Sequence, residues 1–227
     1  MYQFGERSVR CFLYEDKGGV SDEDNVILEV KNVEKFFYGN KKLFQKDRPV
    51  VKAVNDVSFT INEGETFGIV GESGCGKSTL GRTVIRLLNP TSGQVLYKGT
   101  DLATLSGEEM RKLRQEIQII FQDPYASLNP RMTVRELIQA PLDVYSHESE
   151  AEKLAKVKNI MAKVGLREEY MSKYPHEFSG GQRQRIVIAR ALILEPKFIF
   201  CDEPVICSGR ICPCTGIKPD EGPSERI

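Results

Sequence analysis

The sequence lacks several features that would each assign a class of protein at once. Its 32 basic and 32 acidic residues cancel, so bulk charge indicates neither a nucleic-acid-binding surface nor an acidic tail. No apolar run approaches the roughly 20 residues that a membrane-spanning helix needs. The opening residues, MYQFGERSVRC, lack the apolar middle of a secretory signal. We therefore expect the chain to stay in the cytoplasm.

Cysteine is sparse until the end of the chain, where three of the six cysteines gather: Cys207, Cys212 and Cys214. A Cys-x-Cys pair with one further cysteine is a weak match to the four ligands of a structural zinc site. The other three cysteines are more simply interpreted as reduced cytosolic thiols: Cys11, Cys75 and Cys201.

Apolar periodicity predicts strands that alternate with helices. Strands are expected at 26–33 (an edge strand), 57–61, 65–71, within 89–99, at 117–122 and at 197–201. Helices are expected at 77–88, from Ser106 to residue 115, over most of 133–170, and at 180–194. This order favours an α/β fold with a mostly parallel sheet covered on both faces. Residues 1–24 are polar and irregular, and we interpret them as an extension.

The segment GIVGESGCGKSTL matches the P-loop pattern from Gly71 to Ser78, between an apolar strand and a helix. Glycines let the backbone curl so that successive N–H groups point at phosphate oxygens, and the helix N-terminus adds positive potential. Lys77 can reach the outer phosphates, and the Ser78 hydroxyl can bind Mg²⁺. A flexible Gly/Ser turn is the alternative. The predicted nucleotide contacts are Gly71, Glu72, Ser73, Gly74, Cys75, Gly76, Lys77, Ser78 and Thr79.

Two carboxylates, Asp202 and Glu203, follow the apolar run FIFC. At the carboxyl end of a parallel strand both can reach the ligand crevice. Asp202 would then hold Mg²⁺, and Glu203 would orient or deprotonate an attacking water. Many strands end in acidic turns, so this pattern alone is weak evidence for a metal site. It becomes stronger because a P-loop lies upstream.

The segment FSGGQRQRIVIARAL places Ser179, Gly180 and Gly181 directly before a helix. Such a helix start is another site suited to an anion. One nucleotide does not need two such sites on one chain, unless the second serves the nucleotide of a neighbouring subunit. An ordinary Ser/Gly helix cap is the alternative.

The order of these motifs resembles the ATP-binding subunit of an ABC transporter, over about residues 26–205. GESGCGKST resembles Walker A, FIFCDE resembles Walker B, and FSGGQ, which includes Gln182, resembles the signature motif with Phe178 where Leu is commoner. Gln122 matches the Q-loop residue that senses Mg²⁺, and Phe37 falls where the family places a ring against adenine. FQDPYASLNPRMTV and YPHEFSGGQRQRIVIARAL are typical of the oligopeptide/dipeptide importers, especially their second ATPase subunit.

The resemblance implies a P-loop NTPase fold with a RecA-like core in a domain at 25–205, and a helical subdomain at about 122–178 that docks on membrane subunits. It implies ATP and Mg²⁺ as cofactors, Glu203 and Gln122 as catalytic residues, and Ser78, Gln122 and Asp202 as metal ligands. The implied partners are a second ATPase subunit in a head-to-tail dimer, two membrane permeases and, indirectly, an extracytoplasmic peptide-binding protein, with no nucleic acid. The implied location is the inner face of the cell membrane.

The resemblance stops after Val205. The family continues with a D-loop and later strands that carry a switch histidine, but the two histidines here, His147 and His176, both precede Asp202. Residues 205–225 can be back-translated into DNA with a free choice among synonymous codons. If the third base of the Val205 codon is then removed, one permitted DNA sequence encodes VSALDVSVHAQVLNLMKDLQ. This peptide resembles the family's D-loop and the helix that follows it. We interpret residues 206–227 as an out-of-frame tail on a truncated domain; a native cysteine-rich tail is the alternative.

Three functions remain open at this stage. The first is an importer ATPase in truncated form, for which we expect weak nucleotide binding and little or no hydrolysis. The second is a non-catalytic pseudogene product, and the third is a soluble ABC-type ATPase that acts without a transporter. The segment VRCFLYED (9–16) resembles the closing residues of this subfamily's subunits, so a misplaced start or read-through from an upstream gene is a further hypothesis.

Overall fold

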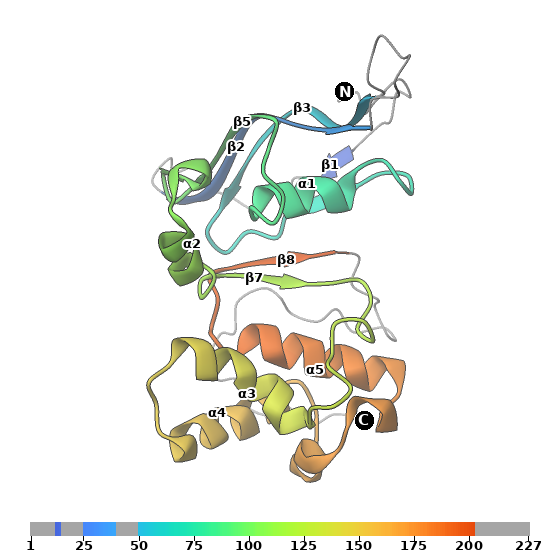
Figure 1. Ribbon diagram of the computed structural model, residues 1–227, viewed down its shortest axis with the longest axis vertical. Coiled ribbons are helices and arrows are strands. Elements are labelled where there is room, and N and C mark those ends of the chain that lie inside the picture. Colours follow the sequence, from blue (N-terminus) through green and yellow to red (C-terminus); the bar gives the residue numbers. More distant parts are fainter. Residues whose placement is uncertain (1–11, 15–24, 40–49, 203–227) are drawn as a thin grey trace, which may run out of the picture.

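The computed structural model describes residues 12–14, 25–39 and 50–202 of the 227-residue chain. Figure 1 shows three tiers: an antiparallel sheet with helix α1 at one end, the strand pair β7–β8 in the middle, and helices α3, α4 and α5 at the other end. Glu203 and the predicted out-of-frame tail at 206–227 lie outside the described residues, as does most of the predicted extension.

The larger sheet has the strand order β3-β2-β5-β6 and is antiparallel throughout. Its strands are β2 (Val26–Tyr38), β3 (Val50–Asn62), β5 (Ser92–Tyr97) and β6 (Thr100–Asp101). The prediction of an edge strand at 26–33 is wrong, because β2 lies between β3 and β5. The alternation in its sequence reflects one buried face, on which Leu28 and Val30 are 1% exposed, rather than an unpaired edge.

The mostly parallel sheet that the sequence predicted is also not what the described residues form. Parallel pairing is confined to β7 (Ile117–Ile120) and β8 (Phe198–Cys201), which pair in register from Ile117–Phe198 to Ile120–Cys201. Strand β4 (Gly68–Val70), shorter than the predicted 65–71, pairs antiparallel with β1 (Phe12–Tyr14). Three residues of the predicted extension therefore contact the strand that leads into the P-loop.

Strands β7 and β8 separate two hydrophobic cores. Phe198 and Phe200 pack with the core of the antiparallel sheet and α1, whereas Ile199 and Cys201 pack with the core of the helices. Successive side chains of a strand point to opposite faces, so this short pair is covered on both sides. Asp202, which directly follows β8, is buried at the end of this pair.

The first two α-helices of the described residues are α1 (Lys77–Val84) and α2 (Gly107–Leu113). The predicted start of α2 is confirmed: the Ser106 side chain accepts a hydrogen bond from the Glu109 N–H, and the Glu109 carboxylate accepts one from the Ser106 N–H. Helix α1 ends at Val84 rather than at the predicted residue 88. The chain turns there because Arg86 adopts a left-handed backbone conformation with φ 54°.

The remaining helices form one body around a single core. The predicted helical stretch at 133–170 divides into α3 (Val134–Tyr145), α4 (Glu150–Lys163) and the 3-10 helix η3 (Glu168–Ser172). Helix α5 (Gly180–Leu192) packs into the same core through Ile186, Val187 and Ala189. This body therefore extends past residue 178, where the predicted helical subdomain ended. None of the helices in the described residues is long and apolar enough to span a membrane.

Gly81 lets α1 approach β8 closely, and replacing it tests this packing. A Cβ atom at Gly81 would lie 1.9 Å from Cζ of Phe200, so the ring has to move. We expect Gly81→Ala to lower the free energy of unfolding by about 1–3 kcal/mol. The measurement is the urea midpoint. The control is Gly107→Ala in α2, where an added Cβ meets nothing within 4 Å; equal midpoints for the two variants would contradict the packing.

Candidate functional site: a phosphate loop beside a paired aspartate

The P-loop connects β4 to α1, and two of its glycines adopt backbone conformations that favour glycine. Gly74 has φ 80° and Gly76 has φ 100°, both in the left-handed region. The loop therefore curls tightly before α1 begins. Gly76 caps α1 with no side-chain hydrogen bond, and the first turn of α1 contains no acidic residue. This arrangement leaves the first N–H groups of α1 available for an anion.

The side chain of Lys77 folds back across the loop. Its ammonium donates hydrogen bonds to the carbonyl oxygens of Gly71 and Glu72, both at 2.8 Å, and lies 3.8 Å from Sγ of Cys75. The lysine thus spans the opening of the loop that contains it. A cation held there lies within the loop where the P-loop pattern predicts the phosphates.

Asp202 follows β8, and it is a buried carboxylate with 3% exposure. The Ser78 hydroxyl donates a 2.5 Å hydrogen bond to Oδ1 of Asp202, and Nη2 of Arg82 donates one to Oδ2 at 3.0 Å. The predicted metal ligands Ser78 and Asp202 are therefore in direct contact. A hydroxyl and a carboxylate are oxygen ligands of the kind that Mg²⁺ takes in nucleotide sites, so these residues fit the predicted cation.

Gln122 lies at the same edge of the strand pair. The N–H of Asp202 donates to the carbonyl of Ile120 at 2.9 Å, so Asp202 lies beside the end of β7, two residues before Gln122. Gln122 is exposed there. The structure thus brings three predicted residues to one edge of β7–β8: Ser78 and Asp202 in contact, and Gln122 next to them in the chain path.

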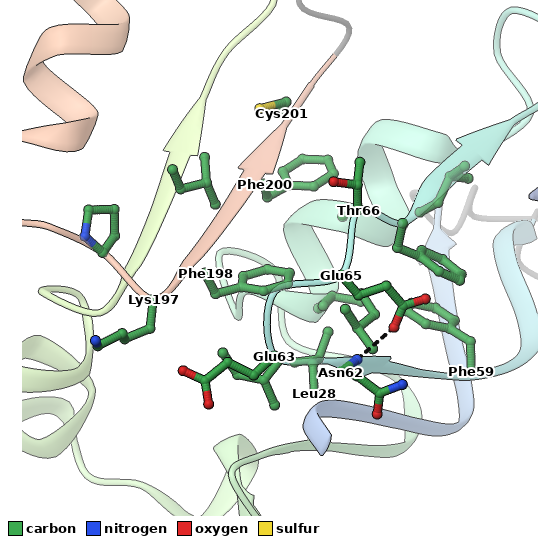
Figure 2. Close-up of a pocket in the computed structure, with 18 of the residues that line it drawn as sticks. Leu28, Phe59, Asn62, Glu63, Glu65, Thr66, Lys197, Phe198, Phe200 and Cys201 are labelled. Carbon is green, nitrogen blue, oxygen red and sulfur yellow. Dashed lines mark hydrogen bonds between the residues drawn. The ribbon is translucent and has the colours of Figure 1, made fainter. Parts of the chain in front are cut away.

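Behind the loop lies a cavity of about 550 Å³, shown in Figure 2. Phe198 and Phe200 of β8 line it on one side and Phe59 of β3 on the other, and Lys77 and Asp202 also line it. No described residue of β7 lines it, so it borders the edge of β8 that β7 leaves unpaired. Its lining combines four phenylalanines with the carboxylates of Glu63 and Glu65. Carboxylates repel phosphate oxygens, so we place the phosphate site at the loop and the N-terminus of α1 rather than here.

The signature segment forms the start of α5. Ser179 caps the helix: its Oγ accepts from the Gln182 N–H at 3.4 Å, and Oε1 of Gln182 accepts from the Ser179 N–H at 3.0 Å. Ser179 and Gly180 are exposed. Figure 1 shows β7 and β8 between α1 and α5, so this helix start does not share a site with the P-loop of the same chain.

Two other predicted residues stand apart from this cluster. Phe37, near the end of β2, is 42% exposed, and the ammonium of Lys35 lies 5.2 Å from its ring centroid. The ring is exposed, and its contact with adenine stays a prediction. Glu203 lies outside the described residues, so its role also stays a prediction.

Arg82 is the site residue that the sequence analysis missed. It follows Ser78 by four residues on α1, and residues at this spacing lie on the same helix face. Its guanidinium carbon also lies 6.0 Å from the ring centroid of Phe121, which precedes Gln122. The helical spacing from Ser78 was the signal that could have identified it.

The sequence profile of a family described as "ABC transporter" matches residues 54–206. The chain belongs to this family. It is 55% identical over 180 residues to the oligopeptide transport ATP-binding protein AppF of Bacillus subtilis, and 51% identical over 189 residues to OppF of Haemophilus influenzae. These matches cover 79% and 82% of this chain, and 55% and 57% of the two relatives. The chain thus spans little more than half the length of these relatives.

Solved structures of ATP-binding cassettes share the fold. The dimeric cassette MJ0796 bound to ADP and Pi has a TM-score of 0.67 and 29% identity, over 79% of this chain and 75% of that chain. CbiO1 from Clostridium perfringens has a TM-score of 0.63 and 29% identity, over 79% of this chain and 66% of that chain. The predicted P-loop NTPase fold and the predicted family are therefore confirmed.

The cap of α5 can be tested by its effect on stability. We expect Ser179→Ala to lower the free energy of unfolding by about 1 kcal/mol, because it removes the Oγ atom that accepts from the Gln182 N–H, while the backbone N–H of residue 179 still donates to Gln182. Ser179→Asp is the matched control, since aspartate is an equally good cap. Thermal and urea unfolding of the two variants measure the difference. A Ser179→Ala variant as stable as Ser179→Asp would refute the importance of the cap.

Proposed function

We propose that the chain binds ATP with Mg²⁺ at the P-loop. The loop N–H groups and Lys77 hold the phosphates, and Ser78 and Asp202 hold the cation. The observation that carries this proposal is the 2.5 Å hydrogen bond between Ser78 and Asp202, which joins the end of β8 to the start of α1 beside the loop. When bound, Mg²⁺ neutralises charge on the phosphate oxygens.

Further roles follow for residues around this centre. Gln122, which follows β7 at the edge where Asp202 follows β8, would contribute to the metal shell and to the positioning of the attacking water. Glu203, next to Asp202 in the chain, orients or deprotonates that water. The remaining loop residues from Glu72 to Thr79 contact the phosphates, and Phe37 packs against adenine. The exposure of its ring supports this last assignment.

We propose that the exposed start of α5 binds the nucleotide of a second ATPase subunit in a head-to-tail dimer. Ser179, Gly180, Gly181 and Gln182 would supply its contacts. The position of α5, beyond β7–β8 from its own P-loop, supports a partner's nucleotide as the ligand. The dimeric state named for the cassette MJ0796 supports the same assembly.

The relatives are named oligopeptide transport ATP-binding proteins, and these names support a role in ATP-driven import of peptides. In this role the chain works on the cytoplasmic face of the membrane, where the body of α3 and α4 docks on two permease subunits. A peptide-binding protein outside the membrane acts through those permeases. ATP hydrolysis provides the energy, and the permeases provide the passage.

The contribution of Lys77 to nucleotide binding can be measured directly. We expect Lys77→Ala to weaken ATP binding at least about tenfold, because a charge-assisted contact to phosphate contributes more than about 1.4 kcal/mol. Calorimetric titration of the full chain with ATP and Mg²⁺ gives the affinity. The control is Lys112→Ala on α2, a lysine that is 73% exposed away from the loop. An unchanged affinity for ATP in a folded Lys77→Ala variant would contradict the proposed nucleotide site.

The dimer contact can be separated from the helix cap. Aspartate at residue 179 retains the cap but adds a negative charge where the partner's phosphates would lie. We expect Ser179→Asp to bind ATP as the unmodified chain does, yet to lose ATP-dependent association with its partner ATPase subunit. Light scattering or sedimentation with and without ATP provides the test. Association that survives this substitution would exclude α5 as the phosphate-binding contact.

A further inference from the structure

Arg82 lies outside every motif of the sequence analysis, yet it contacts the proposed metal ligand. It projects from α1 on the same face as Ser78, and its Nη2 lies 3.0 Å from Oδ2 of Asp202. Its guanidinium also faces the ring of Phe121 at 6.0 Å. One side chain from α1 thus contacts the residue that follows β8 and the residue that follows β7.

The two oxygens of the Asp202 carboxylate have different partners. Oδ1 accepts from the Ser78 hydroxyl at 2.5 Å, and Oδ2 accepts from Arg82. Asp202 is 3% exposed, whereas the Arg82 side chain is 44% exposed. A buried carboxylate needs a compensating charge, and Arg82 supplies it from the solvent side. The contacts also fix which oxygen faces the P-loop.

This division of the carboxylate bears on the choice of cation. Ca²⁺ takes six to eight oxygen ligands and accepts carboxylates through both oxygens, whereas Mg²⁺ requires an octahedral set and takes few protein ligands. We propose, on the basis of the nucleotide-binding function above, that Arg82 is a positioning residue that occupies Oδ2 of Asp202. The carboxylate then offers only Oδ1 to a metal ion, and the site favours Mg²⁺ over Ca²⁺.

The guanidinium suits this role better than an ammonium does. It is planar, permanently charged and directs its donors in fixed directions, so it constrains the plane of the carboxylate that it binds. The substitution Arg82→Lys would retain the positive charge, but the ammonium is a compact group that can rotate, so it would not fix the plane of the Asp202 carboxylate. The conservative substitution therefore separates the orientation of Asp202 from simple neutralisation of its charge.

The experiment measures ATP affinity of the full chain by calorimetry in three solutions, containing EDTA, Mg²⁺ or Ca²⁺. For Arg82→Ala we expect the gain in affinity due to Mg²⁺ to fall by about ten- to hundredfold, as for other residues that orient metal ligands. The affinity in EDTA stays unchanged, and the ratio of the two metal-dependent affinities moves toward Ca²⁺. Arg82→Lys gives an intermediate ratio.

Arg86→Ala is the matched control. Arg86 donates hydrogen bonds to the backbone carbonyls of Leu102 and Leu105, away from Asp202. Its loss lowers the unfolding midpoint but leaves the ratio of Mg²⁺ to Ca²⁺ affinities unchanged. If Arg82→Ala does not fold, the ratio of Mg²⁺ to Ca²⁺ affinities is measured for Arg82→Lys and Arg82→Gln instead. Both of these variants keep a hydrogen-bond donor at residue 82.

The outcomes distinguish this inference from the function on which it rests. If the unmodified chain binds ATP through Lys77 but the Arg82 variants keep its Mg²⁺-to-Ca²⁺ ratio, the inference about Arg82 fails and nucleotide binding stands. If the unmodified chain binds ATP in none of the three solutions, both fail. A changed ratio in the Arg82 variants alone supports the inference.

Discussion

The hydrogen bond between Ser78 and Asp202 is the contact on which the functional arrangement depends. It joins residues 124 positions apart in the sequence and fixes the end of β8 against the start of α1. The other metal and phosphate contacts predicted for the nucleotide of this chain lie near one of these two residues: Lys77 and the loop beside Ser78, and Gln122 after the strand that pairs with β8. Arg82 adds a second bond to the same carboxylate, so the joint resists rotation of the side chain.

The position of β7 and β8 explains why this joint is firm. The pair lies between the sheet core and the helical core, with alternate side chains of β8 packed into each. A carboxylate directly after such a strand is placed by two packed bodies rather than by a loop. Strands β7 and β8 also connect the P-loop to α5. A displacement of the sheet core or of the helical core would shift the end of this strand pair, because both cores pack against it.

The unpaired edge of β8 is the part of this arrangement with least support. Among the described residues β8 pairs only with β7, and β4 pairs only with β1, so the two strands that carry Asp202 and the P-loop do not hydrogen-bond to each other. The aromatic cavity beside β8 separates it from β3. The link between the loop and Asp202 therefore depends on side-chain contacts from α1 and on the packing of Gly81 against Phe200.

Short-range patterns in the sequence determined much of this protein. Four local features follow from residues within a few positions of one another, because turns, caps and apolar runs are local. They are the P-loop, the cap of α2 at Ser106, the cap of α5 at Ser179 and the strand that ends at Cys201, directly before Asp202. The family itself was predictable, since its motifs are long and specific. The alternation of strands and helices likewise gave the class of the fold.

Tertiary structure decided the rest, because pairing and burial join residues that the sequence separates. Alternation in β2 could not distinguish an edge strand from an internal one, since both bury one face. The order of strands and helices could not reveal that parallel pairing is confined to β7 and β8 among the described residues, or that residues 12–14 pair with β4. Arg82 carried no motif of its own; only the approach of β8 to α1 made it a partner of Asp202.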